Sequence, residues 1–201
     1  MQALKAIQTI FPGKVAYPIF DKIGDGADGD VYLTTDDNVI KFSILYDLPE
    51  RYDLDLKILK VISNLKMIKE DSPQHFAKII NINYIGQSSR ATVDGEQKFH
   101  LYYYVLERAY KLSEDERKVF HTLFPQEWDN NKTYPTNSFE AEKIIKDLSK
   151  YLDFDVEKVN MFYTLAVTSK FHHNDPNVNN IMKDKDGNFK FIDFDRIKVK
   201  R

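Results

Sequence analysis

The sequence predicts an α+β protein with an antiparallel sheet and one long helix in its first half and a smaller, mostly helical second half. Strand-like runs bounded by turn residues dominate 17–43 and 79–106. A single stretch at 49–70 has helical periodicity, and 113–171 is mostly helical in pattern. The first half is therefore expected to form a sheet of about five strands that carries one helix.

The elements of the first half follow from apolar periodicity and turn residues. They are a short helix at 2–10, strands at 17–23, 30–35 and 39–43, a helix at 49–70, and strands at 79–85 and 99–106. A glycine-rich stretch separates the first two strands, and Asp36-Asp37-Asn38 gives a tight turn before the third. A polar loop that contains Asp94-Gly95 is expected between the last two strands. The long helix is amphipathic because apolar residues recur at helical spacing: Leu54, Ile58, Val61 and Leu65.

The second half contains three helical segments, which are expected at 113–124, 139–151 and 156–171. The first begins with Ser113-x-x-Glu116, the pattern of a capping box. After the third helix, a polar loop leads to a final hairpin that turns at Asp186-Gly187.

Composition bounds the classes of function. The 201 residues carry a formal net charge of -2 and contain no cysteine, which excludes disulfides, thiolate zinc sites and a cysteine nucleophile. The balanced charge gives no field that would draw the chain to nucleic acid or to an anionic membrane. No apolar run approaches the roughly 20 residues that a membrane-spanning helix needs, and the N-terminus lacks a signal-peptide layout. A soluble, cytoplasmic protein without nucleic-acid or membrane partners is expected.

A phosphate-binding loop is suggested by Gly24-x-Gly26-x-x-Gly29-x-Val31. Glycines allow a backbone to approach phosphate oxygens closely. Dinucleotide-binding proteins share this spacing but need a helix directly after the glycines. Residues 31–33 continue instead as a strand, which favours a hairpin lid over phosphates. The alternative is an acidic surface turn, since three aspartates would repel an anion unless they point outward: Asp25, Asp28 and Asp30.

Lys41 lies in the third expected strand between two apolar residues. A strand lysine can simply face solvent. However, a lysine on the third strand after a glycine lid is where a cation can bridge two phosphates. Asp55, from the long helix, is the expected ionic partner of Lys41, with Asp53 and Glu50 as alternatives.

The densest chemical signal is His173-x-Asp175, followed five positions later by Asn180. Phosphoryl transfer needs a carboxylate that orients an attacking hydroxyl and accepts its proton, and Asp175 suits this role. It also needs oxygen ligands that hold divalent cations. Asn180 and Asp193 suit that role.

Two further residues complete the predicted set. Asp195 can add a metal contact, since the period of two places it on the same strand face as Asp193. His173 is expected to brace the loop by hydrogen bonds rather than to perform acid–base chemistry. Two alternatives remain: His172 and His173 could bind a transition metal together with nearby aspartates, or the segment could be an ordinary polar turn.

In this order the motifs resemble the protein-kinase-like superfamily over about residues 17–196. The catalytic loop is most similar to the branch of choline/ethanolamine kinases and aminoglycoside phosphotransferases. Protein kinases usually carry Gly where this chain has Asp195 and Lys where it has Asn177. The resemblance implies a two-lobed kinase-like fold, with an N-terminal lobe at 1–108, a truncated C-terminal lobe at 109–201 and a central cleft.

The resemblance also implies ATP and Mg²⁺ as cofactors and an adenine-binding connector at 104–109. Leu106 would then guard the back of the adenine pocket, and the backbone of Glu107 and Ala109 would bond the base. The phosphates would contact residues already named: Gly24, Gly26, Gly29, Val31, Lys41 and Asp55. The alternative is that 102–106 forms only a buried strand.

The leading functional hypothesis is an ATP- and Mg²⁺-dependent kinase that transfers the γ-phosphoryl group to a hydroxyl of a protein (Ser/Thr) or of a small molecule. The alternatives are a nucleotide-binding pseudokinase that acts as a protein-interaction module, and transfer of a nucleotide instead of a phosphoryl group. Relatives continue past the metal-binding aspartate with further helices, whereas residues 194–201 follow Asp193 in this sequence. The apolar residues at 161–165 are therefore expected to be covered by 139–151 or by a homodimer contact.

Overall fold

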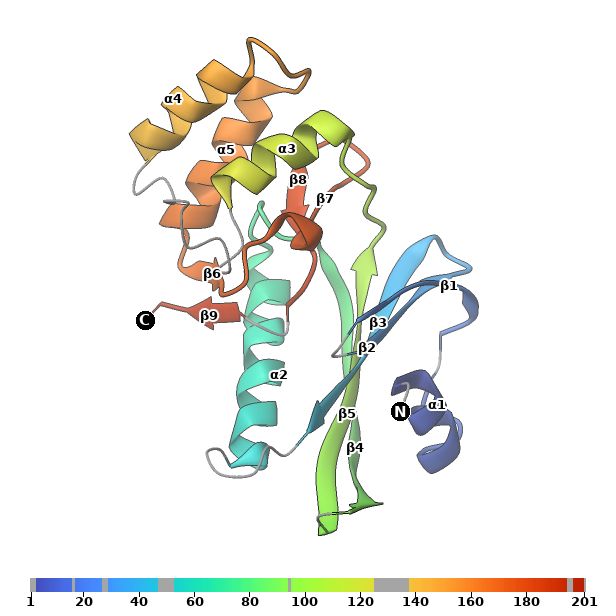
Figure 1. Ribbon diagram of the computed structural model, residues 1–201. Coiled ribbons are helices and arrows are strands. Elements are labelled where there is room, and N and C mark those ends of the chain that lie inside the picture. Colours follow the sequence, from blue (N-terminus) through green and yellow to red (C-terminus); the bar gives the residue numbers. More distant parts are fainter. Residues whose placement is uncertain are drawn as a thin grey trace. The chain divides into compact units, whose positions relative to one another are not determined.

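The computed structural model describes residues 3–15, 17–26, 29–46, 53–93, 95–124, 138–194 and 197–200 (Figure 1). The chain forms two compact units. The first comprises Met1–Asp71 and Lys78–Arg108, and the second comprises Ser72–Ala77 and Ala109–Arg201. The predicted α+β class is confirmed by an antiparallel sheet with one long helix, followed by several helices. The assignment of 1–108 and 109–201 as the two lobes of a kinase-like fold stays a prediction.

The sheet of the first unit has the strand order β1-β2-β3-β5-β4, and the paired strands run antiparallel. Two helices accompany it: α1 (Ala3–Ile10) and α2 (Leu54–Asp71). The strands are β1 (Ile19–Gly26), β2 (Gly29–Thr34), β3 (Asn38–Tyr46), β4 (Ile79–Thr92) and β5 (Gly95–Glu107). Each strand that the periodicity predicted is present.

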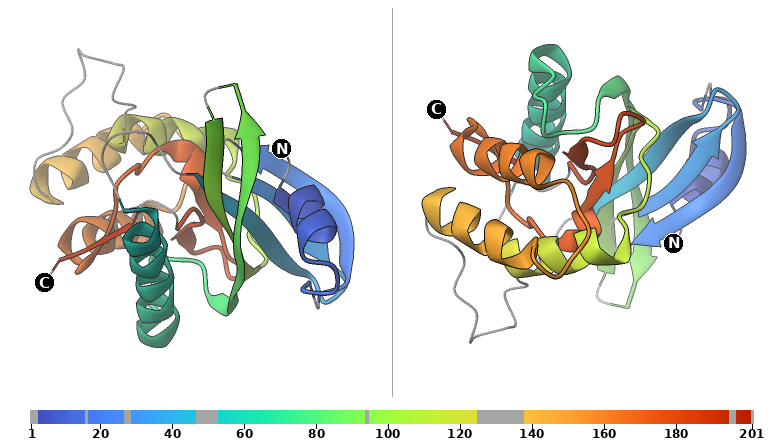
Figure 2. Two further views of the ribbon diagram at one scale, coloured as in Figure 1. Left: turned by 90° about the horizontal axis from the view of Figure 1, so that it is seen from below. Right: turned by 90° about the horizontal axis from the view of Figure 1, so that it is seen from above.

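The two helices cover opposite faces of this sheet. Leu4 and Ile7 of α1 belong to the same apolar cluster as the odd-numbered residues of β5, Phe99 to Val105. Asp55 of α2 instead contacts an even-numbered residue of β5, His100. Because alternate strand residues face opposite sides, α1 and α2 lie across the sheet from each other, as Figure 2 shows. Every residue of β5 from 99 to 106 is buried, which is the pattern of a strand covered on both faces.

The prediction of a polar loop between residues 85 and 99 is wrong, because β4 and β5 continue there as a long hairpin. Polar cross-strand pairs support it. Arg90 Nη2 donates to Gln97 Oε1 over 2.8 Å, and the Ser89 hydroxyl donates to the Glu96 carboxylate. With polar residues on both faces, this part of the hairpin has no apolar alternation for a periodicity argument to detect. β4 ends at Thr92 and β5 begins at Gly95, so the turn lies where it was predicted.

The second unit contains α3 (Glu114–Leu123), α4 (Ser138–Leu148) and α5 (Val156–Thr168). The predicted capping box is present at the start of α3. Glu116 N donates to Ser113 Oγ over 3.2 Å, and Ser113 N donates to the Glu116 carboxylate over 2.6 Å. α4 packs against α5, and Phe162 and Tyr163 are buried, although Met161 remains 46% exposed. A homodimer contact stays a prediction.

Short strands complete the second unit. They are β6 (Phe171–His173), β7 (Ile181–Lys183), β8 (Phe189–Phe191) and β9 (Ile197–Val199), with the 3₁₀ turn η1 (Val178–Asn180) before β7. β7 and β8 form the predicted final hairpin. The third helix was expected to reach residue 171, but α5 ends at Thr168, since Phe171 pairs with Val199 in a β6–β9 ladder.

An aromatic core holds the second unit together. Phe191 stacks on His173 with ring centroids 4.8 Å apart and contacts Phe162 at 4.9 Å. Phe76 joins the same core at 5.5 Å from Phe191, and the two residues also form a parallel β-bridge. β6, the strand that leads to the polar loop, is therefore anchored in this core through His173. In the part of the chain that the structure describes, no helix is both long and apolar enough to cross a membrane.

Candidate active site

The polar loop between β6 and β7 is shaped by its own asparagine side chains. Asn177 N donates to the Asp175 carbonyl over 2.8 Å, which closes a tight turn. The Asn177 side-chain oxygen then accepts from Asn179 N over 2.9 Å and caps η1. This backbone turn and the Asx-type bond of the Asn177 side chain explain why an asparagine-rich segment forms a defined turn here rather than an extended strand.

His173 connects this loop to the segment after β8. Its Nδ1 accepts from Asp175 N over 3.1 Å, and its Nε2 bonds the backbone carbonyl of Asp193. A backbone N–H can only donate and a carbonyl can only accept, so both bonds are made by the neutral imidazole that carries its proton on Nε2. Burial lowers the pKa of His173, although the nearby Asp193 and Asp175 oppose the shift. The bracing role predicted for His173 matches this arrangement.

Amide groups hold the Asp175 side chain. Asn177 Nδ2 donates to Asp175 Oδ1 over 2.7 Å, and Asn180 Nδ2 lies 3.5 Å from Asp175 Oδ2. Asn177 therefore fixes the carboxylate with a neutral donor. Asp175 is half-buried, so its orientation is constrained while the side chain still reaches solvent.

Asn180 and Asp193 are joined through the backbone. Asn180 Nδ2 donates to the Asp175 carbonyl over 2.9 Å, and Ile192 N donates to the Asn180 carbonyl over 3.0 Å. Because the amide nitrogen must face that carbonyl, the Asn180 side-chain oxygen points elsewhere and can act as a ligand. Asp193 follows Ile192 directly. The structure therefore brings Asp175, Asn180 and the backbone of Asp193 together through His173.

The metal-ligand set is only partly described. Asp195 lies outside the described residues, so its predicted role stays untested. Among the residues that the structure describes, no three His, Cys, Asp or Glu side chains are grouped so as to hold a metal ion. Mg²⁺ usually binds through one or two carboxylates together with waters and substrate phosphates. The side-chain oxygens of Asn180 and Asp193 are of the type that Mg²⁺ binds. Both this Mg²⁺ site and the alternative of a transition-metal site at His172 and His173 stay predictions.

In the first unit, the glycine-rich stretch forms the predicted hairpin. β1 ends at Gly26 and β2 begins at Gly29, and Gly24 pairs with Val31. No helix follows the glycines, so the dinucleotide-binding arrangement is excluded. Residues 27–28 lie outside the described residues, as do the side chains of Asp25 and Asp28.

The glycines of this hairpin differ in what they require. A Cβ at Gly29 would lie 1.9 Å from the Phe42 carbonyl oxygen, so a glycine is needed there because β3 passes close to it. A Cβ at Gly24 would find its nearest neighbour, the Val31 side chain, at an ordinary 3.7 Å. The packing of the sheet therefore explains Gly29 but leaves Gly24 without a structural requirement, which makes Gly24 the more informative position for ligand approach.

Asp30 does not act as a repelling surface charge. It is buried at 4% exposure, and its Oδ1 lies 3.0 Å from Lys22 Nζ. Because Lys22 pairs with the Asp30 carboxylate within the sheet, this charge would not repel an anion bound at the hairpin.

Lys41 lies on β3 opposite Tyr104 of β5, with its Nζ 6.0 Å from the centre of the Tyr104 ring. Asp53 caps α2, since its Oδ1 accepts from Asp55 N over 3.0 Å. The Asp55 carboxylate lies 3.1 Å from His100 Nε2. An ion pair between Asp55 and Lys41 stays a prediction, and the alternative Glu50 lies outside the described residues.

The predicted connector begins at the end of β5. Leu106 is buried, as a residue at the back of a pocket would be. Glu107 N donates to the Lys78 carbonyl over 3.0 Å, and Lys78 N donates to Glu107 Oε1 over 2.9 Å. The N–H of Glu107 is therefore already engaged within the sheet. Contacts of Leu106, Glu107 and Ala109 with a nucleotide stay predictions.

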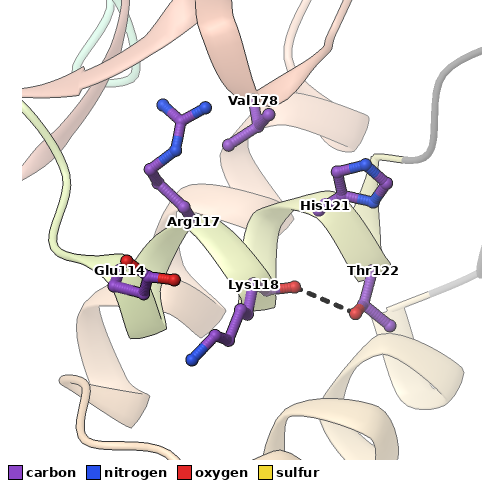
Figure 3. A pocket seen from close by; sticks show the side chains of 6 residues that line it. All are labelled: Glu114, Arg117, Lys118, His121, Thr122 and Val178. Carbon is purple, nitrogen blue, oxygen red and sulfur yellow. Dashed lines mark hydrogen bonds between the residues drawn. The ribbon is translucent and has the colours of Figure 1, made fainter.

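Sequence reasoning missed the side of the loop that faces α3. Arg117 Nη2 donates to Asn179 Oδ1 over 3.3 Å, and Lys183 Nζ of β7 lies 2.8 Å from the Glu116 carboxylate. A shallow cavity of about 430 Å³ lies here, and Figure 3 shows its lining residues: Glu114, Arg117, Lys118, His121, Thr122 and Val178. The run of charged residues at 114–118 could have indicated this polar surface, but a solvent-exposed helix face has the same pattern.

A second cavity, of about 330 Å³, opens on the other side of the loop. α5 lines it with Tyr163, Ala166 and Val167, β6 contributes His172 and His173, and the loop contributes Pro176. Burial lowers the pKa of His172, as does nearby Lys200. Its lining combines aromatic and aliphatic side chains with polar ones.

No protein-family model and no curated protein matches the sequence. Among solved structures, the chain is similar to one described as the ROP18 kinase domain in complex with AMP-PNP and sucrose. The TM-score is 0.47 and the sequence identity is 14%, and the match covers 98% of this chain. The chain spans 59% of the length of that protein's chain. A likeness of this strength transfers neither an activity nor a ligand.

Proposed function

We propose that this chain is an ATP- and Mg²⁺-dependent phosphotransferase of the protein-kinase-like superfamily, which transfers the γ-phosphoryl group to a hydroxyl. The observation that carries the proposal is the double hydrogen bond of His173, which ties the turn at Asp175 to the backbone of Asp193. In this proposal, His173 holds the proposed general base Asp175 close to the backbone of the proposed metal ligand Asp193. Such positioning is the main contribution of a protein to phosphoryl transfer.

Asp175 acts in this proposal as the group that orients the acceptor hydroxyl and takes up its proton. Its two amide neighbours, Asn177 and Asn180, keep the carboxylate in one orientation. His173 acts through Asp175 and Asp193 rather than on the acceptor itself, since both of its ring nitrogens are engaged. It is therefore a positioning residue.

Asn180 Oδ1 and the Asp193 carboxylate would hold Mg²⁺, with Asp195 as a further candidate. When bound, Mg²⁺ neutralises charge on the phosphates during transfer. Lys41 and the backbone of the Gly24–Gly26 hairpin would hold the phosphates, and Leu106, Glu107 and Ala109 would contact the adenine. The acceptor is a hydroxyl of a protein or of a small molecule.

The test compares Asp175→Asn with a matched variant. Asp186→Asn removes the same charge from an exposed hairpin turn in the same unit. Transfer of ³²P from labelled ATP to the chain itself, to lysate proteins and to a panel of small alcohols is measured with Mg²⁺. Asp175→Asn should lose about 10²- to 10⁴-fold in rate, while Asp186→Asn transfers like the wild type.

Nucleotide binding is measured in parallel by the thermal shift that Mg-ATP causes, because a ligand of the folded state raises its stability. A shift without transfer in the wild type would favour the pseudokinase. Equal transfer by Asp175→Asn and the wild type, or neither a shift nor transfer, contradicts the proposal.

A further inference from the structure

A chain of three polar side chains crosses the α2-covered face of the first unit. The Tyr84 hydroxyl of β4 lies 2.8 Å from His100 Nδ1 of β5. On the other side of the ring, His100 Nε2 lies 3.1 Å from Asp55 Oδ1 of α2. This second contact is an ion-pair contact rather than a hydrogen bond, so it acts mainly through electrostatics. Phenol, imidazole and carboxylate thus stand in sequence, and the proposed phosphotransfer chemistry uses neither the phenol nor the imidazole.

The protonation states of the chain are set by its geometry. Asp55 favours a proton on the facing Nε2, which leaves Nδ1 as the acceptor for the Tyr84 hydroxyl. Burial lowers the pKa of His100, and the Asp55 carboxylate opposes this shift only in part. His100 is therefore neutral near pH 7 and can accept a proton through Nδ1.

Tyr84 itself is held as a phenol. Burial, and then the Asp55 carboxylate, raise the pKa of Tyr84. A standing phenolate is therefore disfavoured, and the oxygen becomes nucleophilic only when a base removes its proton as it reacts. The nearest base is already within hydrogen-bond reach, which is the arrangement of an activated nucleophile.

The exposures of the three residues match this role. His100 is buried at 2%, whereas Tyr84 is 44% exposed and the Asp55 side chain is 71% exposed. The Tyr84 side chain is therefore open to solvent, whereas the His100 imidazole is shielded from it. A purely structural link between α2 and the sheet would not need an accessible phenol.

We propose that Tyr84 is a base-assisted nucleophile and the covalent modification site of the first unit, where it takes an acyl group from an activated ester. The phenolic oxygen forms a bond to the acyl carbon, and the bond from that carbon to the leaving oxygen breaks. The phenolic proton passes to His100 Nδ1 and from there to the leaving group or to water. The products are an O-acyl tyrosine and the free alcohol or phenol of the ester, and no redox partner is required.

The experiment uses the full chain with p-nitrophenyl acetate as the probe. Release of p-nitrophenolate gives the rate, and peptide mass spectrometry identifies the acetylated residue. Tyr110 is the internal control because its exposure of 42% is nearly that of Tyr84. Acetylation of Tyr84 should be about 100-fold faster than that of Tyr110, the lower end of the range for general-base assistance.

Three variants separate a chemical role from a structural one. Tyr84→Phe should remove the fast phase. His100→Gln should reduce labelling of Tyr84 to the level of Tyr110, and Asp55→Asn should slow it by a smaller factor. If His100→Gln unfolds the unit, the pH profile of the wild type serves as the second readout. The groups that face the imidazole are Asp55 on α2 and Tyr84 on β4, while Lys98 on β5 is exposed.

Labelling should fall at low pH with a single midpoint below 6.5, as His100 becomes protonated. Equal labelling of Tyr84 and Tyr110, or a Tyr84 rate that follows hydroxide concentration with no low-pH midpoint, would overturn the proposal. Because no ATP is involved, failure of this test leaves the phosphotransferase proposal untouched, and the converse also holds.

Discussion

Acidification is expected to destabilise the second unit through His75. This histidine is 1% exposed, and its Nε2 lies 3.4 Å from the Phe171 carbonyl at the start of β6. A carbonyl can only accept, so Nε2 carries the proton of the neutral ring. Nδ1 is a buried atom for which the described residues supply no hydrogen-bond partner. A second proton would therefore create a charge with no acceptor beside it.

The magnitude follows from the pKa. Burial lowers the pKa of His75 from 6.5 to about 4, and nearby His172 and Lys190 act in the same direction. Between these values the unfolded chain binds a proton that the folded chain refuses, so the free energy of unfolding falls as the pH drops from 6.5 towards 4. The full loss is about 3 kcal/mol, of which about 2 kcal/mol is reached at pH 5.

The assay is urea unfolding followed by circular dichroism at pH 7.5, 6 and 5. His75→Gln keeps a donor for the Phe171 carbonyl but cannot titrate, so its stability should lack this loss. An exposed histidine gives the matched control: His121→Gln removes an imidazole from the surface of α3 and should reproduce the wild-type curve. Parallel curves for the wild type and His75→Gln, or an NMR titration midpoint of His75 near 6.5, would refute the reasoning.

Three further substitutions test the packing around the candidate site. Gly29→Ala should lower the free energy of unfolding by about 3 kcal/mol or more, because its Cβ would lie 1.9 Å from a backbone oxygen of β3. The free energy of unfolding of Gly24→Ala should stay within about 1 kcal/mol of the wild-type value. Equal melting of the two variants in thermal scans would contradict this assignment. Lys183→Met should cost about 1–3 kcal/mol in urea titrations, since it leaves the largely buried Glu116 carboxylate without its 2.8 Å partner; an unchanged midpoint would show that solvent already screens the pair.

Much of the fold could be predicted from the sequence because its main elements are long and amphipathic. α2 buries Leu54, Ile58 and Leu65, three of the four residues that defined its period. The short strands β6 and β9 escaped prediction, since three residues carry no measurable period and their pairing joins positions 171 and 199. The segment 72–77 was also missed, because nothing local marks Phe76 as part of a distant aromatic core.

The candidate site shows the same division. Motif spacing sufficed to place Asp175 and Asn180 in one loop, since only five residues separate them. The tautomer of His173, the amide contact from Asn177 and the ion pair that neutralises Asp30 depend on hydrogen-bond partners. Those partners are set by tertiary packing, so a one-dimensional pattern cannot specify them.

The segment Ser72–Ala77 belongs to the second unit, whereas the chain on both sides of it belongs to the first. Phe191 N donates to the His75 carbonyl and Ala77 N donates to the Phe191 carbonyl, each over 2.9 Å. The polypeptide thus passes from one unit to the other three times rather than once. A fragment that begins at residue 109 would lack six residues of this unit, Ser72–Ala77, which include Phe76 of the aromatic core. Such a fragment would need this peptide added to complete its fold. The second unit therefore needs Ser72–Ala77, which precede β4 in the chain. It can be completed only after the first unit has been synthesised.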